Sequence, residues 1–378
     1  MTINRNAGID LLRILLMLFI ITGHCLAHTS IRGALSFLSD KWLFTWGVQA
    51  LTVCAVDCFI LITGYFMANK IFKSGHIAKL WLKTWVYSIL ITGIFFALKL
   101  TPFSVKMTVE AFFPVFGKVW WFITCYIMLY ILSPFINAGL NTLKDKQLNA
   151  LMLLTVIVFY VLPLFAIIFP PFDNTEGMGI TGFITLYITG FYLAKKQFNL
   201  SLKKCFFYLL INNLVIFLSK ILLTFITQKY NIQAGTALLY HYNTVFELLN
   251  AILLFLIFKQ INIKKAGGLV FFLSSGVFAV YLIHEHPLIR NLLWQTGLKE
   301  ILAEESFFRY IWLILAMPFV ILITCILIDK ILDFILFKPV FKSKLWDFTA
   351  KKLGKADLYF NGITDNKLIK DDKLSDIR

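Results

Sequence analysis

Long apolar runs, separated by short stretches of polar and charged residues, follow one another along almost the whole chain. Runs near the length that crosses about 30 Å of hydrocarbon lie at residues 8–28, 44–68, 84–100, 120–137, 149–169, 180–194, 205–227, 244–259, 268–288 and 309–336. Several runs are short or interrupted by Gly and Pro, so their ends are approximate. The pattern predicts an all-α polytopic membrane protein, a bundle of about ten transmembrane helices.

The loops between these runs alternate in charge. Lysine is concentrated in the loops 69–83, 138–148, 195–204 and 259–267. The opposite loops carry the acids Glu110, Asp173, Glu176, Glu300, Glu304 and Glu305. Cytoplasmic loops carry an excess of Lys and Arg, so the lysine-rich face should be cytoplasmic. An even number of crossings then predicts that both termini are cytoplasmic.

The chain changes character after residue 337, which predicts two regions: a transmembrane domain over 1–337 and a basic cytoplasmic tail over 338–378. The tail begins KPVFKSKLWDFTAKKLGK and mixes Lys with apolar and aromatic residues. Such a segment suits the anionic inner surface of a membrane. Its last twenty residues alternate in charge, and we expect them to be disordered. No soluble catalytic domain is evident, so any chemistry must take place inside the bundle.

Composition supports this class and excludes others. The chain is 59% hydrophobic and only 15% charged, too apolar for one soluble core. Its net charge of +16 is spread over alternate loops and the tail, so we expect no nucleic-acid partner. The six cysteines lie singly in apolar stretches without metal-type spacing, as small buried residues do. The first run lacks a cleavage site and is interpreted as a retained helix.

Arg13 and His24 are eleven residues apart in the first apolar run. On a helix this spacing brings both side chains within roughly 20° of one face, about 16 Å apart along the axis. Polar groups at membrane depth are costly and usually face a bundle interior or a wet cavity. A cation that holds an anion at the surface, with an imidazole deeper in the bundle, suggests a reaction site. The alternatives are an Asp10–Arg13 ion pair and a hydrogen-bonded core histidine.

Few other ionisable residues lie at membrane depth. These are Asp57, Lys220, Glu247, His284, Glu285, His286, Asp329 and Lys330. A desolvated imidazole stays neutral, the form that a general base needs, so His24 is the candidate base. Asp57 could orient a histidine or pair with Lys220. No metal site is expected, because His284 and His286, two residues apart, face different sides of a helix.

His284 ends the run 268–288, which leads outward from the lysine-rich loop 259–267, so we expect it near the outer mouth. There it could orient a substrate that enters from the outer side. Alternatively, it anchors the helix end to Glu285, His286 or a backbone carbonyl. Trp120 and Trp121 open another crossing and suit an aromatic belt at the membrane interface.

At these residues the sequence resembles the membrane-bound acyltransferase 3 family. The family's opening, Asp-x-x-Arg with a His eleven residues after the Arg, matches Asp10, Arg13 and His24. Its second-helix pattern, Val-Asp-x-Phe-Phe-x-x-Ser-Gly-Tyr, matches 56–65, VDCFILITGY. Further matches are Trp121, Phe122, Tyr126, Leu129, Tyr130, Ser133, Pro134, Gly190 and the Tyr281–His284 signature YLIH. The matches occur in order and cover residues 10 to about 285.

The resemblance implies transfer of an acyl group, often acetyl, from cytoplasmic acyl-CoA to a sugar hydroxyl. Typical acceptors are bacterial surface polysaccharides or their lipid-linked precursors, which places the protein in the bacterial inner membrane. His24, Asp57 and His284 form the expected catalytic set, and Arg13, Lys79 and Lys83 would hold the CoA phosphates. The expected substrate-binding residues are Asp10, Trp121, Tyr126, Tyr281 and Glu285. Acyl-CoA is the expected donor substrate, and acetyl-CoA is its expected form. No cofactor is expected to be bound permanently.

The sequence also departs from the family. Many members have arginines just after the second helix, where this chain has Lys79 and Lys83. Lysine meets a phosphate as a point charge but lacks the bidentate fork of arginine. The Ser-x-x-x-Glu run of one subfamily is replaced by Thr124, Cys125 and Tyr126. The alternative function is a transporter or flippase of a glycan or lipid-linked sugar, which would show inverted repeats and paired broken helices.

Overall fold

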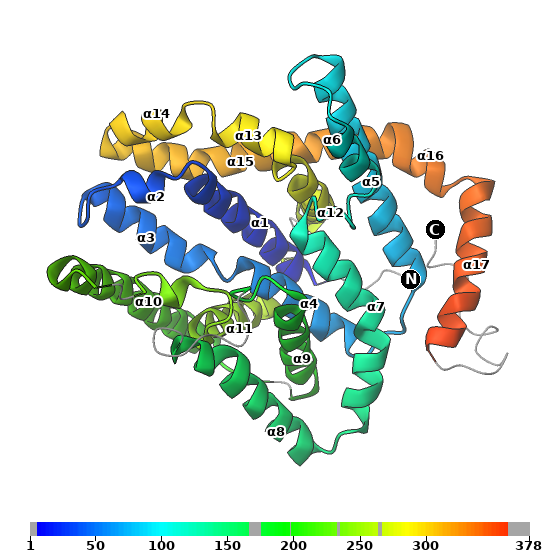
Figure 1. Ribbon diagram of the computed structural model, residues 1–378. Helices are drawn as coiled ribbons and strands as arrows, with labels where there is room; N and C mark the ends of the chain where they lie inside the picture. Colours follow the sequence, from blue (N-terminus) through cyan, green and yellow to red (C-terminus); the bar gives the residue numbers. More distant parts are fainter. Residues whose placement is uncertain (1–5, 166–174, 197, 233–234, 264–266, 362–378) are drawn as a thin grey trace. The chain divides into compact units, whose positions relative to one another are not determined.

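A computed structural model describes residues 6–165, 175–196, 198–232, 235–263 and 267–361. Every regular element in these ranges is helical, and none is a strand (Figure 1). The all-α fold expected from the apolar runs is therefore confirmed. The expected disorder of the last twenty residues falls almost entirely outside the described residues.

Eight helical segments are long and apolar enough to cross a membrane. They are α1 (Ala7–His28), α3 and α4 together (Asp40–Met67), α5 (Ser74–Ala97), α7 (Trp121–Thr142), α8 with its continuation (Asp145–Phe165), α10 (Leu202–Tyr230), α12 (Gly267–His284), and α15 with its continuation (Phe307–Phe341). The chain is thus a multi-pass membrane protein. Many large apolar side chains, such as Leu210 and Phe319, remain exposed on these helices. Lipid is the medium that would cover them.

Helices also form at the other two expected crossings. These are α9 (Ile180–Lys196) and α11 (Val245–Gln260), of 17 and 16 residues. At 1.5 Å per residue they span about 26 and 24 Å, short of about 30 Å of hydrocarbon. The full count of ten crossings and the cytoplasmic position of both termini stay predictions.

The remaining elements are short or amphipathic. They are α2 (Ile31–Ala34), α6 (Val105–Phe112), α13 (Pro287–Trp294), α14 (Leu298–Glu304), α16 (Lys338–Phe341), α17 (Lys344–Phe360), and the π or 3₁₀ segments η1 (Ile157–Val161), η2 (Leu162–Phe165), η3 (Leu238–Tyr240) and η4 (Asp333–Phe337).

The described chain divides into two compact units. Unit 1 comprises 1–68 and 143–326, and unit 2 comprises 69–142 and 327–378. In unit 1, α1 packs against α12, α11, α4 and α3, while α4 also packs against α9 (Figure 1). The contact between α4 and α9 requires glycine on both sides. A Cβ on Gly64 would overlap the Tyr187 carbonyl oxygen, and a Cβ on Gly190 would overlap that of Leu61. Small residues of this kind let membrane helices approach closely.

The run 44–68, expected as a single crossing, is two helices. Helix α3 (Asp40–Thr52) ends before Val53, and α4 (Ala55–Met67) begins after Cys54. Asp57 therefore lies in the first turn of α4 rather than midway along a continuous helix. The partial positive charge of a helix N-terminus favours a carboxylate at this position.

In unit 2, the start of the expected tail is helical and packs against α5. Ser74 donates its backbone N–H to Asp357 Oδ1 at 2.7 Å and its hydroxyl to the Leu353 carbonyl at 3.2 Å. Asn361 exchanges hydrogen bonds with the backbone of Phe72. The helical segment Phe307–Phe341 runs through residue 337 without a break. Binding of the tail to a membrane surface stays a prediction.

Candidate active site

The end of α1 and the end of α12 bring two histidines and a glutamate together in unit 1. His24 and His28 are four residues apart on α1 and so share one face of the helix. Both reach Glu285, which directly follows α12. His24 Nδ1 lies 2.9 Å and His28 Nε2 lies 3.2 Å from Glu285 Oε2. One carboxylate oxygen therefore binds two imidazoles.

His284 adds a third imidazole. Its Nδ1 lies 2.6 Å from the Val280 carbonyl oxygen, and its Nε2 lies 3.0 Å from His24 Nδ1. A carbonyl oxygen only accepts, so Nδ1 of His284 carries its proton and Nε2 has the lone pair. His24 Nδ1 must then be the donor, shared between Glu285 and His284. This order places the lone pair of neutral His24 on Nε2, for which the described residues offer no hydrogen-bond partner.

Glu285 is held from its other side as well. Its Oε1 lies 3.1 Å from Arg290 Nη1, and its side chain is only 9% exposed. Burial by itself disfavours the charged carboxylate, but hydrogen bonds from His24 and His28 outweigh it and lower the pKa of Glu285 below its usual range. Glu285 is thus a carboxylate at neutral pH and can accept hydrogen bonds from the imidazoles beside it.

The next histidine, His286, has a structural role. Its Nδ1 accepts from the backbone N–H of Leu288 at 3.3 Å and so caps α13. Burial, and then the charge of Arg290, lower the pKa of His286 to about 3. His286 is neutral at physiological pH and serves as a helix cap.

His24, His284 and Glu285 have the composition of a metal site. One ligand atom from each lies within 4.8 Å of the others. His284 also donates its second ring nitrogen to a carbonyl, as metal-bound histidines usually do. The sequence spacing of His284 and His286 argued against a metal. The third ligand, His24, belongs to α1, so the spacing of residues around the end of α12 does not reveal it.

His24 and His284 are in contact. The expectation that His24 lies deep in the bundle and His284 lies separately at the outer mouth is therefore wrong. His24 is four residues from the end of α1, and His284 is the last residue of α12. His24 is partly exposed and His284 is fully buried. Tyr281, one turn earlier, places its ring edge-on to His284 with centroids 6.2 Å apart. Of the expected site residues, His24, His284, Glu285 and Tyr281 are therefore brought together.

Arg13 forms the structural ion pair that the sequence left open. Its Nη1 lies 2.8 Å from Oδ1 of Asp10, which is buried. The Arg13 side chain remains 32% exposed. Arg13 thus lies about 16 Å from His24 along the axis of α1. The Asp10 carboxylate already compensates part of the Arg13 charge.

Asp57 does not take either role that was expected of it. Both carboxylate oxygens are buried, and no described residue donates a hydrogen bond to them. Lys220 donates instead to Thr236 Oγ1 at 3.1 Å, so the expected Asp57–Lys220 pair is wrong. The break between α3 and α4 places Asp57 in the first turn of α4.

The other expected binding residues belong to unit 2. Lys83 Nζ lies 3.4 Å from Asp329 Oδ1 and 3.9 Å from Asp333 Oδ1. Lys79 Nζ lies 5.3 Å from the ring centroid of Phe341. Trp121 and Tyr126 both contact the ring of Phe122 between them. Binding of the CoA phosphates by Arg13, Lys79 and Lys83 stays a prediction.

Sequence reasoning missed His28 and Arg290. His28 has a signal, because two histidines at i and i+4 share a helix face. Arg290 has none, since it reaches Glu285 only through the turn between α12 and α13.

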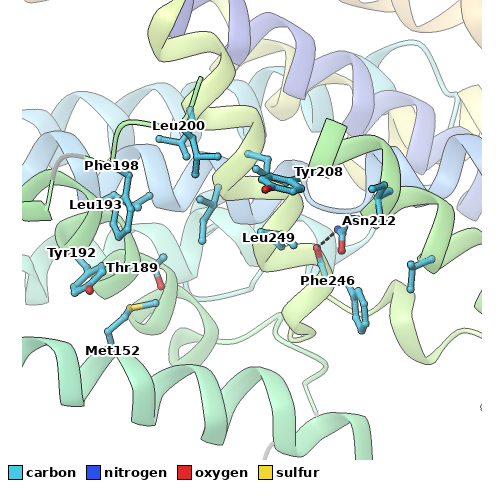
Figure 2. A pocket seen from close by; sticks show the side chains of 15 residues that line it. Met152, Thr189, Tyr192, Leu193, Phe198, Leu200, Tyr208, Asn212, Phe246 and Leu249 are labelled. Carbon is cyan, nitrogen blue, oxygen red and sulfur yellow. Dashed lines mark hydrogen bonds between the residues drawn. The ribbon is translucent and has the colours of Figure 1, made fainter. Parts of the chain in front are cut away.

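A pocket of about 580 Å³ lies elsewhere in unit 1, between α8, α9, α10 and α11 (Figure 2). Apolar side chains such as Met152, Leu193 and Leu249 dominate its lining. One of the few polar groups, the Asn212 amide, donates to the Phe246 carbonyl at 2.8 Å. The pocket suits hydrocarbon, and none of the clustered histidines lines it.

Comparison with known families identifies the family of the chain. A family model described as an acyltransferase domain, that of the acyltransferase 3 family, matches residues 6–330. The chain belongs to the acyltransferase 3 family. With its apolar helices, it is a multi-pass membrane acyltransferase.

The matched range contains the whole cluster of His24, His28, His284, Glu285 and Arg290, and it stops before α16 and α17. The resemblance noted from the sequence is thereby confirmed. Comparisons with curated proteins and with solved structures found no match.

Proposed function

We propose that this acyltransferase moves an acyl group from acyl-CoA to a sugar hydroxyl. The acyl group that we propose is acetyl. The acceptor is a surface polysaccharide or its lipid-linked precursor, and the location is a bacterial inner membrane with both termini cytoplasmic. The observation that carries this proposal is the hydrogen-bond order at His24. Its Nδ1 donates to Glu285 and its Nε2 has a free lone pair. A sugar hydroxyl is the kind of group that such a base activates.

The reaction follows from this arrangement. His24 Nε2 takes the proton of the acceptor hydroxyl as the hydroxyl oxygen attacks the thioester carbonyl carbon. The C–S bond then breaks and the CoA sulfur leaves with its electron pair. The imidazolium gives its proton to that sulfur, which returns His24 to the neutral state. Glu285 stabilises the imidazolium between these two steps, since its carboxylate lies 2.9 Å from Nδ1.

His284 and His28 act through their neighbours. His284 is fully buried and contacts His24 Nδ1, so we propose that it positions the His24 ring instead of contacting the acceptor. His28 and Arg290 hold Glu285 in place. Glu285, expected as a substrate-binding residue, contacts His24, His28 and Arg290, so we propose that it orients the base instead.

The donor would bind through its phosphates. Arg13 on α1, with Lys79 and Lys83, offers cations for these groups, and the flexible pantetheine arm could carry the thioester along α1 towards His24. Acyl-CoA is used as a substrate and is not a resident cofactor. Exclusion of water by the bundle would favour transfer over hydrolysis.

The test uses the full-length protein, purified in detergent and supplied with radiolabelled acetyl-CoA and a membrane glycan extract. We expect label in the glycan with wild type and almost none with His24→Ala. A matched control is His241→Ala, which removes a histidine paired only with Glu176 in a loop region. Transfer at wild-type rate by His24→Ala would contradict the proposal. The transporter alternative predicts no consumption of the thioester at all.

A further inference from the structure

Two cations of unit 1 lie over the same tryptophan. Lys220 Nζ is 3.8 Å and Arg32 Cζ is 5.9 Å from the ring centroid of Trp46. Lys220 makes one hydrogen bond, to Thr236 Oγ1. Neither cation forms an ion pair with a carboxylate within the described residues. Two positive charges therefore lie over the Trp46 ring, and no described carboxylate pairs with either of them.

This arrangement is costly in the absence of an anion. Lys220 is only 6% exposed and belongs to the apolar helix α10. A cation–π contact offsets only part of the free energy that it costs to take an ion out of water. Burial also lowers the pKa of Arg32, so desolvation affects both cations. An anion bound between them would offset the repulsion and the lost hydration.

The surroundings offer further polar groups. Trp46 Nε1 and Gln49 Oε1, one turn apart on α3, are buried without a hydrogen-bond partner in the described ranges. An indole N–H can donate to an anion, and a carboxamide oxygen can accept from a hydroxyl. The Tyr240 hydroxyl, by contrast, is used, because it donates to the Trp46 carbonyl at 3.1 Å. The unused groups match a ligand that carries both a negative charge and hydroxyl groups.

The site is connected to the histidine cluster. Arg32 follows His28 by four residues, across the turn that ends α1. Burial raises the pKa of the Tyr242 hydroxyl, and the charges of Asp57, Glu247 and Glu285 raise it too, while Arg32 lowers it. Tyr242 is thus within electrostatic reach of both Arg32 and Glu285. Arg13, the donor cation on α1, is about 22 Å from His28 along the helix axis.

We propose that Arg32, Lys220 and Trp46 form a binding site for a phosphate or carboxylate group on the sugar acceptor. The assignment to the acceptor rests on the proposed function. It follows from the position of the site at the histidine end of α1, away from Arg13. The acceptor class is thereby an anionic sugar, with its hydroxyl directed to His24 Nε2.

The experiment measures binding to full-length protein in detergent. Glucose 1-phosphate, glucuronate and neutral glucose are titrated separately, with tryptophan fluorescence and melting temperature as readouts. We expect the two anionic sugars to bind, and glucose to bind at least about tenfold more weakly, as loss of a charge-assisted hydrogen bond implies. The relative affinities of phosphate and carboxylate identify the anionic group. In Trp46→Phe, which removes the indole N–H, both the fluorescence change and the thermal shift should be reduced.

Variants assign the binding to the two cations. Arg32→Gln and Lys220→Met should each weaken binding of the anionic sugar by about tenfold or more. The charge-conserving Arg32→Lys and Lys220→Arg should retain most of it, which guards against misfolding as the cause. The control is Lys229→Gln, on the same helix, whose lysine lies over Phe225 and Tyr230 but is exposed.

Three results would overturn the proposal: no binding of either anionic sugar, unchanged affinity in both Arg32→Gln and Lys220→Met, or glucose binding as tight as the anionic sugars. A loss of CoA binding in the same variants would also overturn it, because the site would then serve the donor. His24→Ala should abolish transfer, while the anionic sugars should still bind more tightly than glucose. Failure of the catalytic proposal and failure of this one are therefore distinguishable.

Discussion

Nδ1 of His24 lies 2.9 Å from Oε2 of Glu285, so a carboxylate from the end of α12 orients an imidazole from α1. In this relationship the proton of His24 is on the nitrogen that faces Glu285, and the other nitrogen can act as a base. Glu285 in turn is held by His28 and Arg290. The pair would orient His24 as the proposed base, and it leads to the first prediction.

Glu285→Gln should lower the rate of acyl transfer by about 10²–10⁴, comparable to the loss of general-base catalysis. The amide cannot stabilise an imidazolium, and it can donate to His24 Nδ1 and so reverse the tautomer. The KM for acyl-CoA should stay unchanged. Steady-state kinetics with labelled acetyl-CoA measure both constants. Glu305→Gln, which removes a surface partner of Arg309, is the control and should behave as wild type. A normal rate in Glu285→Gln would exclude the pair from catalysis.

His284→Ala should lower kcat about tenfold or more, as expected for one hydrogen bond that orients the base, and leave binding of acyl-CoA intact. The substitution removes the contact with His24 Nδ1 but no group that reaches a substrate. His284→Gln, whose amide can restore an acceptor near His24, should recover part of the rate. Loss of acyl-CoA binding by a folded His284→Ala variant would place His284 in the donor site instead.

Added Zn²⁺ should inhibit transfer, and EDTA should reverse the inhibition. The ligand atoms of His24, His284 and Glu285 are close enough to bind one metal ion, and a bound cation would make His24 a weaker base. Glu285→Gln should reduce zinc binding, measured by isothermal titration independently of activity. The opposite result, loss of activity on EDTA treatment and recovery with Zn²⁺, would show that a metal is required.

Lys79→Ala and Arg13→Ala should raise the KM for acyl-CoA by an amount equivalent to ~1–3 kcal/mol, because each removes a cation proposed for the CoA phosphates. Arg13→Ala and Lys83→Ala should have a second effect. They remove the ion-pair partners of buried Asp10 and buried Asp329, and loss of the partner of a buried charge is strongly destabilising. Melting temperatures should therefore fall for Arg13→Ala and Lys83→Ala but not for Lys79→Ala. Unchanged KM values in all three would mean that these cations serve topology alone.

Gly190→Ala should destabilise the protein by about 1–3 kcal/mol, the range for overpacking. Its Cβ would overlap the Leu61 carbonyl oxygen and force α4 and α9 apart. Gly93→Ala is the matched control, since a Cβ there meets no atom within 4 Å and alanine favours a helix. Thermal unfolding in the same detergent compares the two. Equal melting temperatures would show that the α4–α9 contact yields at little cost.

The helices could be predicted from the sequence because lipid imposes a simple local condition. Each crossing must be apolar over a fixed length and satisfy its backbone within itself, so composition alone reveals it. The same reasoning identified the shared face of Arg13 and His24, which follows from helix geometry within α1. It could not find the break at Val53 and Cys54, since that stretch is as apolar as its neighbours.

What the sequence by itself determined is therefore local: the helical class, the crossings, and the register of side chains along each helix. The partners of those side chains come from elsewhere in the chain. Glu285 is 261 residues from His24, Lys220 pairs with Thr236 and Trp46 rather than Asp57, and Gly64 meets Tyr187 of α9. Helices in lipid lack a hydrophobic drive to choose one another, and small residues and hydrogen bonds select the pairs. That selection depends on three-dimensional fit, which only the tertiary structure decides.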